Sequence, residues 1–326
     1  MIESLKNKKV LVTGGAGFIG SNLVEALLNI GAIVTVFDNL ETGKLSNLSE
    51  FESNPNFTFI QGDLRNVEDC QRAVKDIDII SHQAALGSVP RSIEFPQNTH
   101  AVNATGFLNM LHAAKEEGIK RFVYASSSSV YGDSTISPKV IGSEGNLLSP
   151  YAVTKQLNEK YANVYALLHQ METIGLRYFN VFGPKQDPHG VYAAAIPKFI
   201  DCMVNGEEIV INGDGEQTRD FTYVENAVKA NILALTSENR AIFGKFYNVA
   251  CGEYYSLNDV IKEIASRLKH LGEFNENSSI IYGPDRLGDV RDSLADISLT
   301  NQDLNYHNAV SFSDGIRKYL QLMFVK

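Results

Sequence analysis

The sequence predicts an α/β fold, with a Rossmann-type doubly wound parallel sheet and a smaller mixed α/β substrate-binding domain. Apolar, strand-like runs alternate with helical patterns through the first half of the chain, as in a parallel sheet covered by helices on both faces. The first of these runs leads into a glycine-rich turn. A strand, a glycine turn and a helix in this order are typical of dinucleotide-binding folds.

The first strand and its turn are the run Val10–Val12 and the segment TGGAGFIG at 13–20, after which a helical pattern continues through Leu28. The glycine spacing lets the backbone approach a pyrophosphate closely at the positive end of a helix. We therefore expect this turn to bind the cofactor through Gly14, Gly17, Phe18, Ile19 and Gly20.

The second strand, Ile33–Phe37, ends at Asp38. A carboxylate at this place accepts hydrogen bonds from the adenosine ribose diol and repels a 2′-phosphate. The sequence therefore predicts NAD as the cofactor in preference to NADP.

Four more strands are predicted at 57–61, 77–82, 121–126 and 173–177, with helices near 98–117 and 150–170. In such sheets ligands bind beyond the carboxyl ends of the strands, where Asp63, Ala84, Ala85 and the serines at 126–129 follow their strands. We expect residues 1–178 to form the NAD-binding domain, completed by a strand returning near 245–249. Residues 179–326 would then form most of a discontinuous substrate-binding domain.

Tyr151 and Lys155 follow the serine run in SPYAVTK. On a helix the i, i+4 spacing places both side chains on one face. A phenol acts as a base at neutral pH only if nearby positive charge lowers its pKa, and Lys155 together with an oxidised nicotinamide supplies such charge. The pattern predicts Tyr151 as the catalytic base, with serine hydroxyls holding the substrate oxygen.

Composition limits the partners and the location. The chain has 326 residues, a formal net charge of −9 and three cysteines without a metal-ligand or disulfide pattern. We expect no general affinity for nucleic acid, no metal site and no membrane span, because no apolar run approaches the length of one. Reduced cysteines and the absence of a signal-peptide pattern favour the cytoplasm.

Several longer motifs resemble those of the extended short-chain dehydrogenase/reductase superfamily, and specifically nucleotide-sugar 4-epimerases of the UDP-N-acetylglucosamine type. The resemblance covers nearly the whole chain. The motifs that carry it are TGGAGFIG at 13–20, DN at 38–39, GDLR at 62–65, HQAALGSVPRS at 82–92, SSSSVYGD at 126–133, SPYAVTK at 149–155, LRYFNVFGPKQDP at 176–188, INGDGEQTRDF at 211–221 and GDVRDSLADIS at 288–298.

The resemblance implies roles for individual residues. It makes Ser127 the catalytic serine beside Tyr151 and Lys155, with Ser129 as a second hydroxyl, and it places Arg219 and Arg286 on the diphosphate. The further cofactor contacts that it implies are Asn39, Gly43, Asp63, Leu64, Gln83, Ala84, Ala85, Asn103 and Tyr178, besides Asp38 and the catalytic pair. The further substrate contacts are Gly87, Ser88, Ser128, Asn180, Ala194 and Ser293.

The same resemblance narrows the reaction. Relatives that dehydrate or decarboxylate the sugar carry acidic residues just before the VYG motif, whereas this chain has Ser128 and Ser129 there. Epimerisation at C4 through a transient 4-keto sugar therefore fits better. By eye, Ser293 occupies a gate position where epimerases confined to plain hexoses carry Tyr, which favours a UDP-N-acetylhexosamine (UDP-GlcNAc/UDP-GalNAc) or its uronic acid, used for surface polysaccharide.

Other interpretations remain open. UDP-glucuronate or UDP-glucose is the alternative substrate, a net dehydrogenase would release its reduced cofactor, and a non-catalytic NAD-binding sensor would share the fold. Retention of both Tyr151 and Lys155 argues against the sensor. The helices near 98–117 and 150–170 are expected to form a homodimer contact, unless their apolar positions all belong to the core.

Overall fold

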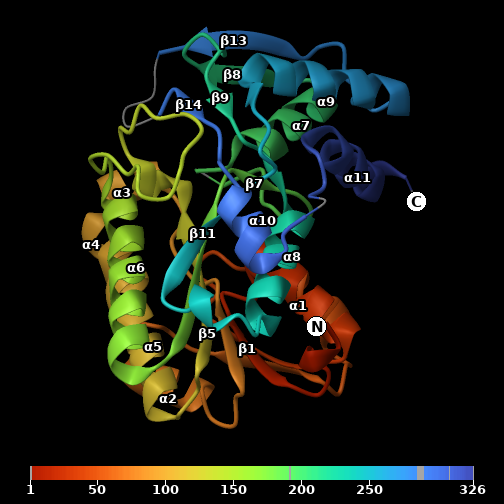
Figure 1. Ribbon diagram of the computed structural model, residues 1–326. Helices are drawn as coiled ribbons and strands as arrows, with labels where there is room; N and C mark the ends of the chain where they lie inside the picture. Colours follow the sequence, from red (N-terminus) through yellow and green to blue (C-terminus); the bar gives the residue numbers. More distant parts are fainter. Residues whose placement is uncertain (1, 191, 285–289, 308, 326) are drawn as a thin grey trace.

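Parallel strands form a seven-stranded central sheet in the order β11-β6-β5-β4-β1-β2-β3 (Figure 1). The computed structural model describes residues 2–190, 192–284, 290–307 and 309–325. The strands of this sheet are β1 Lys9–Thr13, β2 Ile33–Asp38, β3 Phe57–Gln61, β4 Ile79–His82, β5 Arg121–Ser127, β6 Glu172–Tyr178 and β11 Lys245–Val249. The doubly wound parallel fold predicted from the sequence is confirmed.

Helices cover both faces of this sheet. On β1 the side chains alternate, so that Val10 and Val12 join one buried cluster and Leu11 joins the other. The first cluster packs against α1 and α8, and the second against α2, α5 and α6. The bounds of these helices are α1 Phe18–Ile30, α2 Val67–Ala73, α5 Gly106–Glu116, α6 Pro150–His169 and α8 Val224–Thr236.

The helix expected near 98–117 is divided into three segments: α4 Pro96–His100, a π-helical turn Ala101–Thr105 and α5. The shorter helix α3 Val89–Glu94 precedes them. A π-helical turn widens the helix locally and is often found at functional sites. Here it carries Asn103, one of the residues expected near the cofactor.

Small sheets build the remainder of the molecule, on the side of the carboxyl ends of the central strands (Figure 1). They comprise β7 Val181–Phe182 with β10 Thr222–Tyr223, β8 Glu208–Asn212 with β13 Ser279–Gly283, and β9 Thr218–Arg219 between β12 Tyr255–Ser256 and β14 Asp292–Ser293. The helices here are α7 Ala195–Asn205, α9 Leu257–Leu271, α10 Ser298–Leu304 and α11 Phe312–Phe324. Short 3₁₀ turns occur at 2–5, 45–47, 49–51, 128–131 and 240–242.

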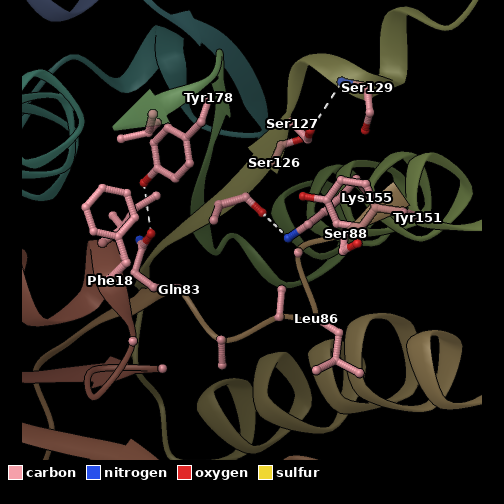
Figure 2. A pocket seen from close by; sticks show the side chains of 18 of the residues that line it. Phe18, Gln83, Leu86, Ser88, Ser126, Ser127, Ser129, Tyr151, Lys155 and Tyr178 are labelled. Atoms are coloured by element: carbon pink, nitrogen blue, oxygen red, sulfur yellow. Dashed lines mark hydrogen bonds between the residues drawn. The ribbon is translucent and has the colours of Figure 1, made fainter. Parts of the chain in front are cut away.

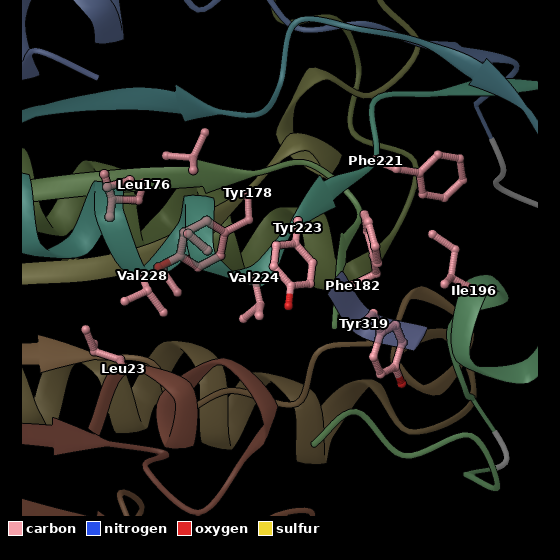
Figure 3. Close-up of a cluster of buried hydrophobic side chains, with 14 of the residues drawn as sticks. Leu23, Leu176, Tyr178, Phe182, Ile196, Phe221, Tyr223, Val224, Val228 and Tyr319 are labelled. Atoms are coloured by element: carbon pink, nitrogen blue, oxygen red, sulfur yellow. The ribbon is translucent and has the colours of Figure 1, made fainter. Parts of the chain in front are cut away.

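One hydrophobic cluster runs from the central sheet into this second region (Figure 3). It includes Leu23 and Leu176 near the sheet, and Phe221, Ile196 and Tyr319 further out. Two elements that follow residue 179 also belong to the central sheet, because β11 pairs with β6 and α8 packs on its face. Among the described residues, no helix is long and apolar enough to cross a membrane.

Candidate active site

Tyr151 and Lys155 lie on the first turns of α6. The Ser149 hydroxyl caps this helix by accepting a hydrogen bond from the Ala152 N–H at 3.2 Å. Pro150 takes the first helical position, where its missing N–H would be unpaired in any case. The helix therefore begins directly before Tyr151, and its period brings both side chains to the same wall (Figure 2).

The ammonium of Lys155 donates a hydrogen bond to the Ala125 carbonyl at 2.8 Å, and it lies 5.9 Å from the centroid of the Tyr151 ring (Figure 2). Burial lowers the pKa of Lys155 to about 8, and the negative charge of Glu159 opposes that change. Loss of hydration disfavours the charged form of a buried amine. The protonation of Lys155 is therefore sensitive to charges close to it.

The environment of the Tyr151 phenol in the protein alone favours its protonated form. Burial raises the pKa of Tyr151, and a hydrogen bond with the Ser127 side chain offsets part of the increase. The ammonium of Lys155 is bonded to a backbone carbonyl and does not reverse this effect. In the protein alone Tyr151 is protonated at neutral pH, so further positive charge, such as an oxidised nicotinamide, is needed to make it a base.

Serine hydroxyls line the end of β5. The Ser127 hydroxyl accepts a hydrogen bond from the Ser129 N–H at 3.2 Å (Figure 2). The Ser129 hydroxyl is buried and has no partner in the described part of the chain. Because an unpaired buried hydroxyl costs free energy, a ligand oxygen placed there would be stabilised.

A cavity of about 580 Å³ opens between the glycine turn and these side chains. Most of the site residues expected from the sequence line it. They are Gly14, Gly17, Phe18, Ile19, Gly20, Asp38, Asn39, Asp63, Leu64, Gln83, Ala84, Ala85, Gly87, Ser88, Ser127, Ser128, Ser129, Tyr151, Lys155, Tyr178, Asn180, Ala194, Arg219 and Ser293.

The remaining three expected residues differ. Asn103 lies behind the cavity, where its side chain accepts from the Leu86 N–H at 2.7 Å and donates to the Leu86 carbonyl at 3.2 Å. Gly43 packs on the glycine turn, since a Cβ there would lie 2.9 Å from the Ala16 carbonyl carbon. Arg286 lies outside the described residues. Asn103 and Gly43 therefore shape the walls of the cavity from behind.

The glycine turn fits a dinucleotide. Gly14 has a φ of 66°, and a Cβ on it would lie 2.6 Å from the Ala84 Cα. A Cβ on Gly20 would lie 2.1 Å from the Gly14 carbonyl oxygen. Only glycine allows this close turn, which leaves the first N–H groups of α1 facing the cavity, where they can bind a phosphate.

Acidic groups surround the place expected for the adenosine ribose. The buried Asp38 carboxylate accepts hydrogen bonds from the Ala16 N–H at 3.0 Å and the Leu40 N–H at 2.8 Å. The neighbouring cation, Arg65, is bound to Asp63 through Nε at 2.9 Å and holds the pKa of Asp63 at about 2. This arginine is therefore already paired and does not offset the negative charge of Asp38.

A hydrogen-bond network supports the floor of the cavity. The Tyr178 hydroxyl donates to Gln83 Oε1 at 2.9 Å and accepts from Asn231 Nδ2 at 2.6 Å. Gln83 Nε2 in turn donates to Asn231 Oδ1 and to the Ser81 hydroxyl, each at 2.9 Å. Sequence reasoning missed Asn231, because it lies on α8 and nothing local in the chain connects it with the cofactor region.

A second cavity, also of about 580 Å³, continues from the first. The two share Ser88, Asn180, Ala194 and Arg219 among their linings. The second is formed mainly by α7 and β8 and is lined by Lys198 and Asn212. An elongated ligand can therefore extend from the glycine turn and Tyr151, past Arg219, into the second cavity.

Comparison with known proteins places this arrangement in a family. The model of the NAD dependent epimerase/dehydratase family matches residues 10–250. The chain belongs to this family. Its glycine turn, Asp38 and the Tyr151–Lys155 pair all lie within the matched segment, and NAD is the cofactor of the family.

Family members with similar sequences or structures span nearly the whole chain. The UDP-glucose 4-epimerase of Mycolicibacterium smegmatis is 33% identical over 316 residues, 96% of this chain and 97% of its own length. The solved UDP-N-acetylglucosamine 4-epimerase of Methanobrevibacter ruminantium, in complex with UDP-N-acetylmuramic acid, is 38% identical with a TM-score of 0.89 and 98% coverage of both chains. A UDP-glucuronic acid 4-epimerase of Bacillus cereus, solved with UDP-glucuronic acid and NAD, is 32% identical with a TM-score of 0.86, covering 97% of this chain and 100% of its own.

Sequence reasoning also missed Lys139, which, unlike Asn231, lines the cavity of this epimerase/dehydratase site. It is 3% exposed and lines the main cavity. In the sequence Lys139 lies between the VYG motif and the catalytic helix, in a stretch predicted as a loop. No local pattern there indicates that its side chain lines a cavity. The backbone pairing that brings it to the cavity joins residues far apart in the chain, as the bridge between Lys139 and Ala295 shows.

Proposed function

We propose that this chain catalyses the NAD-dependent C4 epimerisation of a UDP-N-acetylhexosamine (UDP-GlcNAc/UDP-GalNAc) or of its uronic acid, through a transient 4-keto sugar, to supply surface polysaccharide precursors. The observation that supports epimerisation most strongly is the set of side chains that line the cavity together with Tyr151. Ser127, Ser128 and Ser129 offer hydroxyls there and no carboxylate. The three similar proteins described above are named as UDP-sugar 4-epimerases, which supports the reaction class.

Bound NAD would accept the hydrogen from C4 and return it. The chain's own residues handle the proton: Tyr151 takes the proton of the C4 hydroxyl when that carbon is oxidised and returns it when the carbon is reduced. The ammonium of Lys155, held by the Ala125 carbonyl at 2.8 Å, contributes only part of the positive charge that the phenolate needs, and Ser127 donates a hydrogen bond to the C4 oxygen. Only hydride and proton exchange at one carbon is needed.

Dehydration and decarboxylation need more than this wall provides. Loss of water from the sugar requires a further acid and base, and here the positions before the VYG motif are Ser128 and Ser129. Val130, which follows, is fully buried. Epimerisation needs only Tyr151, Lys155 and a serine hydroxyl from this chain, and no further acid or base.

Epimerisation also requires that the sugar turn over while its nucleotide stays bound. The second cavity can hold the nucleoside, and Arg219 lies where the two cavities join. A guanidinium suits a diphosphate because its donors match two oxygens at once. The hexose would then be held by fewer contacts than the nucleotide, which leaves it free to present either face.

Ser293 supports the N-acetylated sugar. It is buried, lines the main cavity, and pairs with Arg219 across β14 and β9. A small side chain at this place leaves room for an acetamido group that a large ring would fill. We therefore favour the acetylated substrates over UDP-Glc and UDP-Gal.

The test is incubation of the purified protein, without added NAD, with UDP-GlcNAc, UDP-Glc and their uronic acid counterparts, followed by separation of the C4 epimers. We expect a mixture of epimers from the acetylated sugars. Strict dependence on added NAD with accumulation of NADH would instead support a dehydrogenase. A protein that binds NAD and converts none of the four would be a sensor.

We also propose a homodimer through α6 and the helices next to it. Apolar side chains on α6 remain exposed in the single chain: Leu167 and Leu168 at 73% and 71%, and Val153 and Val164 at 48% and 44%. Light scattering on the eluting protein distinguishes a dimer from a monomer, and charged substitutions of Leu167 and Leu168 should shift a dimer toward monomer.

A further inference from the structure

We propose that Lys139 binds a carboxylate on the sugar, so that the preferred substrate is a UDP-N-acetylhexosamine that carries an acidic group. This inference rests on the proposed function. Sequence reasoning assigned no role to Lys139. The shape of the site does not distinguish acidic from neutral UDP-N-acetylhexosamines, whereas a lysine that binds a carboxylate does.

The first observation is a buried cation that has no counter-ion among the described residues. Lys139 is 3% exposed. Its ammonium donates a short hydrogen bond to the Ser134 carbonyl, and within the described residues no carboxylate lies at ion-pairing distance from it. The acidic group that influences it most, Asp292, is exposed and accepts a hydrogen bond from the Thr218 hydroxyl at 2.7 Å.

Burial of an unpaired charge is costly, and such groups in proteins are normally paired. An ammonium has three donors, of which the Ser134 carbonyl takes one. An anionic ligand in the cavity would therefore find a cation that is already desolvated and still has donors available.

The second observation is that the backbone of Lys139 is held firmly by the segment 294–296 and by Asn248. Its N–H donates to the Leu294 carbonyl at 2.7 Å, and its carbonyl accepts from the Asp296 N–H at 3.1 Å and from Asn248 Nδ2 at 2.9 Å. These contacts attach Lys139 to the segment that carries Ser293. The lysine and the proposed gate therefore move as one unit.

The third observation separates Lys139 from the diphosphate. Arg219 lines both cavities, whereas Lys139 lines only the one that contains Tyr151. A diphosphate at the junction would meet Arg219, and the sugar would extend toward Lys139. The acidic group that Lys139 meets is therefore on the hexose, either as a C6 carboxylate or as a carboxylate attached through an ether.

The test compares turnover of neutral UDP-GlcNAc with that of its C6 uronic acid, and measures competitive inhibition by UDP-N-acetylmuramic acid, whose carboxylate is on the C3 ether. The wild-type chain should have a higher kcat/KM for the uronic acid than for UDP-GlcNAc if the C6 carboxylate is recognised. If UDP-N-acetylmuramic acid inhibits tightly but kcat/KM for the uronic acid is no higher than for UDP-GlcNAc, Lys139 binds the ether-linked carboxylate instead.

In Lys139→Met, kcat/KM for the acidic sugar, or the affinity for the acidic inhibitor, should fall about 10- to 100-fold, the range of a charge-assisted hydrogen bond. The loss on UDP-GlcNAc should be smaller, so that the ratio of kcat/KM for the acidic sugar to kcat/KM for UDP-GlcNAc falls. Lys262→Met, which removes an exposed lysine on α9, should alter neither.

Equal losses on acidic and neutral sugars in Lys139→Met would show a structural role only and would overturn the proposal. If that variant does not fold, the substrate preference of the wild-type chain tests the proposal. A higher kcat/KM for UDP-GlcNAc than for its uronic acid, together with weak inhibition by the acidic compounds, overturns the proposal. Absence of turnover on every UDP-sugar would instead refute the epimerase function itself.

Discussion

Arg177 and Glu159 form a buried, two-pronged ion pair directly behind the catalytic residues, with both nitrogen–oxygen distances at 2.8 Å. Arg177 lies on β6, and Glu159 lies one helical turn beyond Lys155 on α6. The same carboxylate accepts the Ser126 hydroxyl at 2.6 Å, and its charge raises the pKa of Lys155 against the effect of burial. One carboxylate thus connects the sheet with the protonation of the catalytic lysine.

We predict that Glu159→Gln lowers the pKa of Lys155 below about 8. Because the charged lysine supports catalysis, the alkaline limb of kcat should move to lower pH. Breaking a buried pair also leaves Arg177 without its main partner, so the free energy of unfolding should fall by about 3 kcal/mol. Denaturant unfolding and a pH profile of kcat measure the two effects.

A matched control is Glu117→Gln, which removes the partner of Lys75 in a surface ion pair. Exposed pairs contribute about 0–1 kcal/mol, so neither the stability nor the pH profile should change appreciably. An unchanged alkaline limb in Glu159→Gln would show that Lys155 does not depend on this carboxylate.

Replacement of Tyr151 by Phe should reduce turnover by a factor on the order of 10² or more, the scale of a lost acid or base. The fold and NAD binding should persist, because the ring remains and only the hydroxyl is removed. Near-normal epimer formation by this variant, with NAD content checked by absorbance, would refute the role of Tyr151.

Asp38 should make the protein bind NAD more tightly than NADP. A 2′-phosphate would meet the buried Asp38 carboxylate, and the nearby Arg65 is occupied by Asp63. Titration of cofactor-free protein with each nucleotide measures the two affinities. In Asp38→Asn the difference between the affinities for NAD and NADP should become smaller. Equal affinity of the wild-type chain for the two would contradict this assignment.

Ser293→Tyr should remove activity on the acetylated sugars and spare UDP-Glc and UDP-Gal. Ser293 is only 9% exposed and lines the cavity, and extra volume in a packed site costs about 1–3 kcal/mol or more. Ser293→Ala is the size-matched control and should keep the acetylated sugars as substrates. A full rate of Ser293→Tyr on UDP-GlcNAc would rule out the gate.

His82 should make the fold sensitive to acid. It is buried between the rings of Phe107 and Phe122, and burial lowers its pKa to about 3. Between pH 6.5, the ordinary value, and about pH 3, the unfolded chain binds a proton that the folded chain does not. Stability is therefore complete above this range and falls as the pH decreases through it, by up to about 1.4 kcal/mol per pH unit.

The measurement is denaturant unfolding at a series of pH values. In His82→Gln the position no longer titrates, so the variant should be less stable at neutral pH but show a shallower decline on acidification. If the free energy of unfolding falls with pH at the same rate in the variant and the wild type, other groups cause the acid sensitivity.

Much of the fold could be predicted because the signals are local. Most predicted strands of the central sheet are short runs rich in apolar residues, and the glycine turn follows from steric requirements at Gly14 and Gly20. That Tyr151 and Lys155 lie on the same face of a helix follows from their spacing of four residues alone. The cavity lies at the carboxyl ends of the strands because every parallel sheet of this topology has its ligands there.

Tertiary structure alone decided the contacts between segments distant in sequence. Asn231 reaches Tyr178 only because α8 packs across the sheet, and Lys139 reaches the cavity only because its backbone pairs with residues 294–296. The direction of the Lys155 ammonium toward a carbonyl also depends on the register of β5 against α6. The sequence by itself determined which chemical groups are available, whereas long-range packing and hydrogen bonding determined which of them face the cavity, because side-chain direction and burial depend on neighbours that local patterns do not contain.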